Sequence, residues 1–213
     1  RTHLEELHDR GAAAARVLEL AAVGDMKAML GSPSTSHTSS VDSDGRGCSV
    51  TVSAGYGSGA MVPGTGMWLN NSLGEVELHT GGFHGVPPGV RLVSNMAPTV
   101  ARSRHGAVLA IGSPGASRIT TAVSSVLVNF IHLGMSLSDS IEHARLHTEI
   151  FNDVRTVSYE PGIDVSAVTD FDMRRVPDIS MYFGGVQAAL WDPLAGFFEM
   201  ADPRRSGGVA HGG

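Results

Sequence analysis

The spacing of apolar residues changes along the chain, and this change most limits the folds that the sequence can adopt. In residues 3–31 apolar side chains recur about every 3.6 positions, which predicts a helix, or two shorter helices because Gly11 and Gly24 interrupt the pattern. From Ser34 the period becomes two, and the Asp-Gly pair at 44–45 separates two alternating runs. Such a pair between alternating runs is typical of a β-hairpin.

The rest of the chain switches between strand-like and helix-like segments. Strands are expected at 67–71, 92–101, 105–112 and 155–162, with a closing hairpin formed by 184–192 and 196–204. Helices are expected at 113–134, at 136–147 with Ser136 or Ser138 as the N-cap, and at 164–177 with Asp164 opening it. Hairpins mixed with clustered helices predict a layered α+β domain rather than a doubly wound α/β fold.

The composition excludes several classes of protein. Of the 213 residues 42% are hydrophobic and 17% charged, which predicts an ordered domain with a core rather than a disordered chain. The net charge of −6 and the lack of a basic stripe argue against a nucleic-acid partner, and no apolar run is long enough to span a bilayer. His79, His84 and His105 do not have the spacing of a closed metal-ligand set, so no metal is expected.

Thr35 and His37 stand at the head of the first alternating run and are the first candidates for chemistry. Side chains alternate along a strand, so these two residues share one face. A threonine in an edge strand is by itself commonly structural, and His37 fits a hydrogen-bonded structural role as well as a supporting role beside a nucleophile.

Five short motifs occur in an order that resembles the γ-glutamyltranspeptidases (glutathione hydrolases), which belong to the N-terminal-nucleophile hydrolases. They are TSHTSSVDSDG, GMWLNN, LVSNMAPT, IGSPGASRI and ADPRR, and they extend from about Thr35 to Arg205. The resemblance implies a four-layer αββα sandwich. It also implies that residues 1–34 are the end of a large-subunit-like segment and that 35–213 form a small-subunit-like catalytic domain.

In the family a precursor cuts itself just before a threonine, and the matching bond here joins Ser34 to Thr35. The chemistry has a physical basis, because a threonine hydroxyl must lose a proton to attack. A free α-amino group with an ordinary pKa near 8 can accept that proton within the same residue. The resemblance therefore makes Thr35 the nucleophile, with its own amine as the base and His37 as a support.

The turn Ser113–Ser117 matches the family's oxyanion-binding turn, whose glycine pair falls on Gly115 and Ala116. Backbone N–H groups at the start of a helix can hold a developing oxyanion. Replacing the second glycine by alanine keeps the backbone donor if φ is negative, whereas a positive φ strains Ala116.

The resemblance also suggests substrate-binding residues. Ser94 and Asn95 fall where the family holds the substrate's α-carboxylate, and Glu75 falls on the acidic residue that holds its α-amino group. Ser53 matches a position that usually carries a supporting threonine. Three further positions depart from the family's pattern: Ser72 and Gly74 replace two of the amide and acidic positions that follow the Asn pair, and Gly55 stands where an asparagine often contacts substrate.

The expected function is therefore a γ-glutamyltranspeptidase-like hydrolase or acyltransferase that acts on γ-glutamyl amides such as glutathione and passes the acyl group to water or to an acceptor amine. The resemblance implies no metal or organic cofactor. The implied partners are a large-subunit-like segment outside this chain and a homodimer or a heterodimer of processed subunits. Two alternatives stay open: a cephalosporin-acylase-like amidohydrolase with another acyl group, and a non-catalytic relative of the family.

Overall fold

The computed structural model describes residues 35–75, 78–79, 82, 85–151 and 153–212. The helix expected at 3–31 therefore lies outside the described residues. The contacts of the chain divide it into two compact units. Among the described residues, the first unit takes in Thr35 and part of 53–94, and the second takes in 36–52 and nearly all of 95–212.

The expected hairpin at the start of the described region is confirmed. Strands β1 (Thr35–Val41) and β2 (Gly47–Ser53) form a two-stranded sheet. Gly45 has a φ of 73°, which a glycine adopts without steric cost. The Asp42 carboxylate accepts hydrogen bonds from the backbone N–H groups of Asp44 (3.0 Å) and Arg46 (2.9 Å), so a short polar side chain closes the turn.

The second unit is built on a four-stranded antiparallel sheet with the order β3-β4-β8-β9. Its strands are β3 (Thr99–Arg102), β4 (Val108–Gly112), β8 (Gln187–Asp192) and β9 (Gly196–Ala201). The hairpin expected at the C-terminal end is confirmed as β8 and β9, with Gln187 opposite Ala201 and Asp192 opposite Gly196. β4 is buried along its whole length, so it forms the centre of the sheet.

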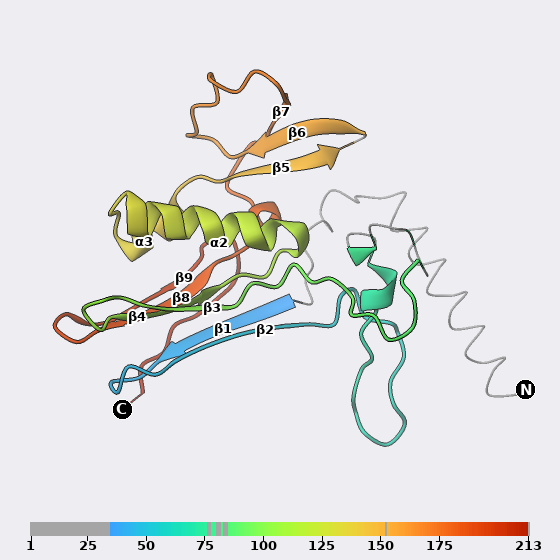
Figure 1. Cartoon of the computed structure of the whole chain (residues 1–213), viewed down its shortest axis with the longest axis horizontal. Coiled ribbons are helices and arrows are strands. Elements are labelled where there is room, and N and C mark those ends of the chain that lie inside the picture. Colours follow the sequence, from blue (N-terminus) through green and yellow to red (C-terminus); the bar gives the residue numbers. More distant parts are fainter. Residues whose placement is uncertain (1–34, 76–77, 80–81, 83–84, 152, 213) are drawn as a thin grey trace, which may run out of the picture. The chain divides into compact units, whose positions relative to one another are not determined.

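Helices cover one face of this sheet (Figure 1). The expected helix after β4 is present as a 3₁₀ turn η3 (Ala116–Arg118), the α-helix α2 (Ile119–Leu127) and a π-helical turn η4 (Val128–His132). Helix α3 (Leu137–Glu142) follows, and the Ser136 hydroxyl accepts the Asp139 N–H as its N-cap. The shared core contains Leu109, Ile111, Ala122, Val123, Val126, Leu137, Ile141, Val186 and Ala188.

The β1–β2 hairpin packs on the opposite face of β4. Leu109 and Ile111 point toward the helices, whereas Val108 lies beside Gly47 and Gly112 lies under the ring of His37. The second unit thus has a helix layer, a sheet and a second sheet in that order, which confirms the α+β class and supplies three layers of the expected αββα sandwich. Val50 and Val52 are exposed on the outward face of the hairpin, and none of the described helices covers them.

A three-stranded sheet follows α3, with β5 (Leu146–Phe151) antiparallel to β6 (Val154–Tyr159) and β6 parallel to β7 (Asp172–Arg175). The helix expected at 164–177 is wrong. The Asp164 carboxylate accepts the Ser166 N–H in a local turn instead of opening a helix. The residues of β7 then form backbone hydrogen bonds with β6 in a parallel pairing, in place of helical hydrogen bonds. The helix expected at 136–147 ends at Glu142, because Leu146 already pairs with Tyr159.

Two expected strands are also wrong in extent. Residues 67–71 make only the isolated bridge between Met61 and Trp68, and 92–101 becomes strand only at Thr99. Both segments are rich in exposed side chains, so they lack the buried face that stabilises a strand. Two short 3₁₀ turns, η1 (Ser72–Gly74) and η5 (Met181–Phe183), complete the described elements.

The turn between β4 and α2 has an unusual backbone. Gly115 has a φ of 138° and Ala116 a φ of 51°. The left-handed conformation costs a residue with a Cβ about 1–2 kcal/mol relative to glycine. Ala116 therefore carries strain that a glycine would not.

The first prediction concerns this strain. Ala116→Gly should raise the free energy of unfolding by about 1 kcal/mol, since relief of the left-handed conformation outweighs the extra chain entropy of glycine. Urea denaturation measures the change. Ala122→Gly, the same exchange inside helix α2, should lower the stability by at least about 1 kcal/mol. Equal losses at both positions would contradict the strain at Ala116.

Candidate functional site

Thr35 and Ser53 come together at the open end of the hairpin. Thr35 is the first residue of β1 and is buried, with 6% of its surface exposed. Its Oγ1 lies 2.9 Å from the Oγ of Ser53, the last residue of β2. The Ser53 hydroxyl also accepts the Gly55 N–H at 3.0 Å, which fixes the serine. The hairpin thus holds the Thr35 hydroxyl in one orientation.

A second group of polar residues lies just beyond β2. Gly55 has a φ of 63°, and a Cβ there would lie 2.2 Å from the Asn71 Oδ1 and 2.4 Å from the Glu75 Oε1. The Asn71 side chain accepts the Tyr56 N–H at 2.6 Å. The backbone at Gly55 is therefore in close contact with an amide and a carboxylate, and no side chain fits at this position.

The structure thus brings Thr35, Ser53 and Glu75 into one connected group, through the Ser53–Gly55 hydrogen bond and the contact of Glu75 with Gly55. Asn71 was not predicted as a site residue. The Asn-Asn pair at 70–71 was its only sequence signal, and only the fold shows that the second asparagine turns toward Gly55.

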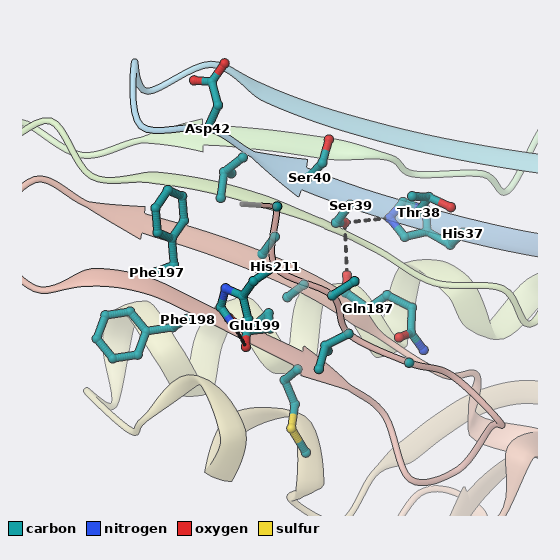
Figure 2. Close-up of a pocket in the computed structure, with 18 of the residues that line it drawn as sticks. His37, Thr38, Ser39, Ser40, Asp42, Gln187, Phe197, Phe198, Glu199 and His211 are labelled. Carbon is teal, nitrogen blue, oxygen red and sulfur yellow. Dashed lines mark hydrogen bonds and ion pairs between the residues drawn. The ribbon is translucent and has the colours of Figure 1, made fainter.

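His37 lies in a polar layer between the hairpin and the four-stranded sheet. Its Nδ1 is 2.7 Å from the Thr51 Oγ1 and its Nε2 is 2.9 Å from the Ser39 Oγ. The Ser39 hydroxyl in turn donates to the Gln187 carbonyl, as Figure 2 shows. Burial lowers the pKa of His37 from 6.5 to about 4, so the ring is neutral at physiological pH. A Cβ on Gly112 would lie 2.2 Å from its Cε1, so this histidine requires a glycine in β4.

The turn predicted to bind an oxyanion opens α2. Gly115 and Ala116 both have positive φ, so the expectation that Ala116 is strained holds for this backbone. A Cβ on Gly115 would lie 2.8 Å from the Gly184 Cα, which means that the turn is pressed against a second backbone segment. The first N–H groups of a helix lack partners inside the helix and can face an anion.

Ser94 and Asn95 lie in the segment without regular structure before β3. Ser94 is exposed and Asn95 is partly buried, and the boundary between the two units falls between them. Their predicted role in substrate binding stays a prediction.

The second unit also contains a cavity of about 740 Å³ (Figure 2). It is lined by residues 37–43 of the first strand and its turn, by β8 and β9, and by the C-terminal residues 208–212. His211 pairs with Glu199 across it at 2.7 Å. The Gly115–Ala116 turn, which belongs to the same unit, does not line this cavity.

The described residues contain no group of three or more His, Cys, Asp or Glu side chains that could hold a metal ion. None of their helices is long and apolar enough to cross a membrane.

Comparisons with known proteins agree with the motif order. A family model described as Gamma-glutamyltranspeptidase matches residues 2–212. The glutathione hydrolase proenzyme of Bacillus subtilis (strain 168) is 32% identical over 160 residues, which cover 74% of this chain and 27% of that protein. The Acylase ACY 1 proenzyme of Pseudomonas sp. (strain SE83) is 34% identical over 120 residues, covering 55% of this chain and 22% of that protein. The chain thus spans about a quarter of the length of these two curated relatives.

A solved structure has the same fold. The gamma-glutamyltranspeptidase from Pseudomonas nitroreducens, solved in complex with L-DON, superposes with a TM-score of 0.66 at 27% identity. The match covers 83% of this chain and 99% of that chain. The motif order, the layered fold and the match over nearly the whole sequence lead to one conclusion: this chain belongs to the gamma-glutamyltranspeptidase family.

Proposed function

We propose that this chain supplies the small-subunit-like catalytic part, residues 35–213, of a hydrolase and acyltransferase that acts on γ-glutamyl amides such as glutathione. Thr35 is the nucleophile, and cleavage of the Ser34–Thr35 bond frees its amine. The observation that carries the proposal is the buried Thr35 hydroxyl at the head of β1, 2.9 Å from the Ser53 Oγ. Membership of the family supports it.

The proposed reaction proceeds through an acyl ester on Thr35. The α-amino group of Thr35 takes the proton of its own hydroxyl, and Oγ1 attacks the carbonyl carbon of the amide. Backbone N–H groups of Gly115 and Ala116 stabilise the oxyanion that forms. The C–N bond then breaks, the leaving amine takes the proton, and an acyl ester on Thr35 remains. Water or an acceptor amine attacks this ester and releases Thr35 again.

We assign roles to the neighbouring side chains partly from their contacts and partly from the family's motif pattern. The Ser53 hydroxyl orients the Thr35 hydroxyl, and His37 supports β1 as a neutral ring whose two nitrogens already face Thr51 and Ser39. Glu75 pairs with the α-ammonium group of the substrate, while Ser94 and Asn95 bind its α-carboxylate together with an arginine from a large-subunit-like segment. We propose no metal or organic cofactor for this reaction.

One observation favours a second candidate, a cephalosporin-acylase-like amidohydrolase. An asparagine at the position of Gly55 is part of the glutamyl-binding pattern, and the close approach of Asn71 and Glu75 leaves no room for any side chain there. The group of polar residues beyond β2 therefore differs from that pattern, and an acylase proenzyme is among the relatives.

Cleavage of the precursor tests the nucleophile. Intact mass spectrometry of the full-length precursor should show two fragments that separate between Ser34 and Thr35. Thr35→Ala should stay uncut and lose activity by at least about a thousandfold, because the attacking oxygen is gone. Thr35→Ser should still be cut, because it keeps the hydroxyl. Thr38→Ala, an exposed position of the same strand, is the control and should process normally. Normal processing of Thr35→Ala would exclude the mechanism.

Acyl specificity tests the choice between the two candidates. In one competition assay the wild type should prefer a γ-glutamyl anilide to a glutaryl amide, which lacks the α-ammonium group. Glu75→Gln should lower kcat/KM for the glutamyl substrate about 10- to 100-fold, since a charged hydrogen bond contributes about 1.5–3 kcal/mol, and leave the glutaryl substrate unchanged. A preference for the glutaryl amide, unaffected by Glu75→Gln, would favour the acylase.

The neutral His37 predicts a pH dependence of stability. Its pKa is about 4 in the folded chain and near 6.5 when unfolded, so the unfolded chain binds more protons between these values. The stability contribution is present above pH 6.5 and is lost as the pH falls toward 4. Urea unfolding at several pH values should show this loss, and His37→Asn should reduce its slope. His147, whose pKa burial also lowers, should leave a residual slope.

His105 is exposed, so His105→Asn is the control for that measurement. This variant should keep the wild-type dependence of stability on pH. If His37→Asn and the wild type lost stability in parallel on acidification, His37 would not be held neutral by the fold.

A further inference from the structure

The strained turn at Gly115 and Ala116 is held by a hydroxyl that comes just before it. Ser113 is fully buried, and its Oγ donates to the Pro114 carbonyl at 2.6 Å. The same oxygen accepts the Gly185 N–H at 3.0 Å. One serine thus joins the turn to a segment 72 residues further along the chain.

We call residues 182–186 the buttress segment. Its backbone is fixed at four residues, each by a different side chain: the Tyr182 carbonyl by Arg118 (3.1 Å), the Phe183 carbonyl by Arg145 (3.2 Å), the Gly185 N–H by Ser113 and the Val186 N–H by Asp202 (2.8 Å). Side-chain hydrogen bonds at nearly every residue of a loop remove most of its freedom to move. The buttress segment is therefore a rigid support rather than a flexible connection.

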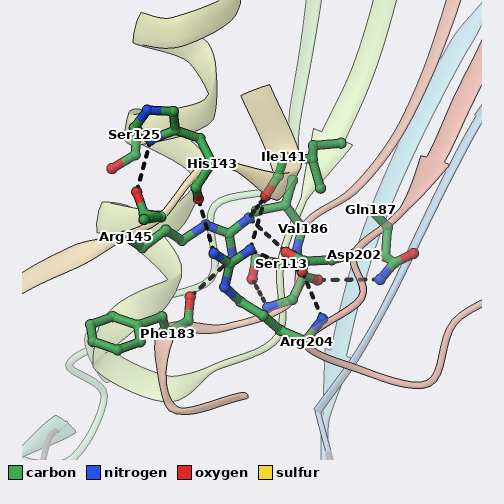
Figure 3. A network of polar contacts seen from close by, with 12 residues as sticks. Ser113, Ser125, Ile141, His143, Arg145, Phe183, Val186, Gln187, Asp202 and Arg204 are labelled. Atoms are coloured by element: carbon green, nitrogen blue, oxygen red, sulfur yellow. Dashed lines mark hydrogen bonds and ion pairs between the residues drawn. The ribbon is translucent and has the colours of Figure 1, made fainter. Parts of the chain in front are cut away.

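A buried cluster of charged side chains is hydrogen-bonded to the buttress segment, as Figure 3 shows. We call it the buried charge cluster. Asp202 pairs with Arg145 at 2.6 Å and with Arg204 at 3.3 Å, and Arg204 pairs with Glu160 at 2.5 Å. These side chains are at most 2% exposed. Removal of one partner from a buried ion pair leaves an uncompensated charge, so the cluster has little tolerance for displacement.

The backbones of the buttress segment and the turn are in close contact. A Cβ on Gly184 would lie 2.7 Å from the Ser113 Oγ and 3.0 Å from the Pro114 carbonyl oxygen. On the other side, a Cβ on Gly115 would lie 2.8 Å from the Gly184 Cα. Two glycines therefore let the backbones touch, and any movement of Gly184 is passed to the turn.

We propose that Ser113 and Gly184 are positioning residues that hold the Gly115–Ala116 backbone where its N–H groups face the developing oxyanion. The buttress segment is hydrogen-bonded to the buried charge cluster and contacts the turn, so the cluster restricts the movement of the turn through this segment. This inference rests on the proposed function, because it assigns a role within the same acyl transfer. Backbone donors stabilise a transition state only when they are held in place before charge develops, and a strained turn holds its place only when its surroundings fix it.

The test compares two buried serines in the processed enzyme. Ser113→Ala removes the link to the buttress segment, and Ser140→Ala removes an equally buried hydroxyl that donates to the Ser136 carbonyl in α3. Ser113→Ala should lower kcat for the γ-glutamyl anilide about 10- to 100-fold with KM within about twofold, because donors are misplaced only for the transition state. Ser140→Ala should keep both constants, although both variants lower the unfolding midpoint.

The affinity for an inhibitor provides a second measurement, which would stay unchanged if Ser113 had a purely structural role. A γ-boronic acid analogue of glutamate forms a tetrahedral adduct with the nucleophile and so places an oxygen in the proposed oxyanion position. Its inhibition constant should rise in Ser113→Ala by the same factor as kcat falls, while the inhibition constant of glutamate itself stays unchanged. Gly184→Ala, whose new Cβ would push on Ser113 and Pro114, should reproduce this pattern.

The outcomes separate the two proposals. A processed wild type that neither turns over the anilide nor binds the boronic acid overturns the proposed function. An active wild type in which Ser113→Ala and Gly184→Ala keep the kcat and boronic acid affinity of Ser140→Ala overturns the positioning role alone. A rise in KM with unchanged kcat also overturns it, since that result assigns Ser113 to substrate binding.

Discussion

The buried carboxylate of Asp202 is the interaction on which the second unit depends most. It accepts the backbone N–H groups of Val186 and Arg204 and pairs with two guanidinium groups. Through these contacts the end of β9, the segment before β8 and the end of α3 are fixed to one point, because Arg204 also binds the Ile141 and His143 carbonyls. A charge this deep is tolerated only because every part of it is paired. The ADPRR motif therefore has a structural explanation.

The second constraint is the polar layer between the two sheets. Sheets usually pack through apolar side chains, but here the inward face of the hairpin carries His37, Ser39, Ser49 and Thr51. Ser49 donates to the Ile111 carbonyl and Ser39 to the Gln187 carbonyl, so hydrogen bonds fix the hairpin to β4 and β8. Apolar contacts allow sliding between positions of similar energy, whereas hydrogen bonds do not. The position of β1, which Thr35 opens, is specified in this way.

Two departures from the family's motif pattern have different physical consequences. Ala116 keeps a backbone N–H in the turn at the cost of a left-handed conformation, so the proposed oxyanion donor is retained and only strain is added. Gly55 instead reflects a change in packing, because Asn71 and Glu75 fill the space that a side chain would need. The first departure leaves the proposed acyl transfer intact, whereas the second concerns which acyl group fits.

The sequence was sufficient to predict the features that depend on neighbouring residues: the Asp-Gly hairpin, the closing hairpin of β8 and β9, the Ser136 cap, and the motif order that indicates the family. It also placed Thr35, Ser53 and Glu75 among the candidates, and these form one connected group. The fold was needed to establish that 172–175 is a strand, that Ala116 has a positive φ and that Gly184 touches Gly115. Periodicity and turn residues report the local backbone, whereas these features arise where segments distant in sequence meet, and their energy depends on the partner that each segment finds.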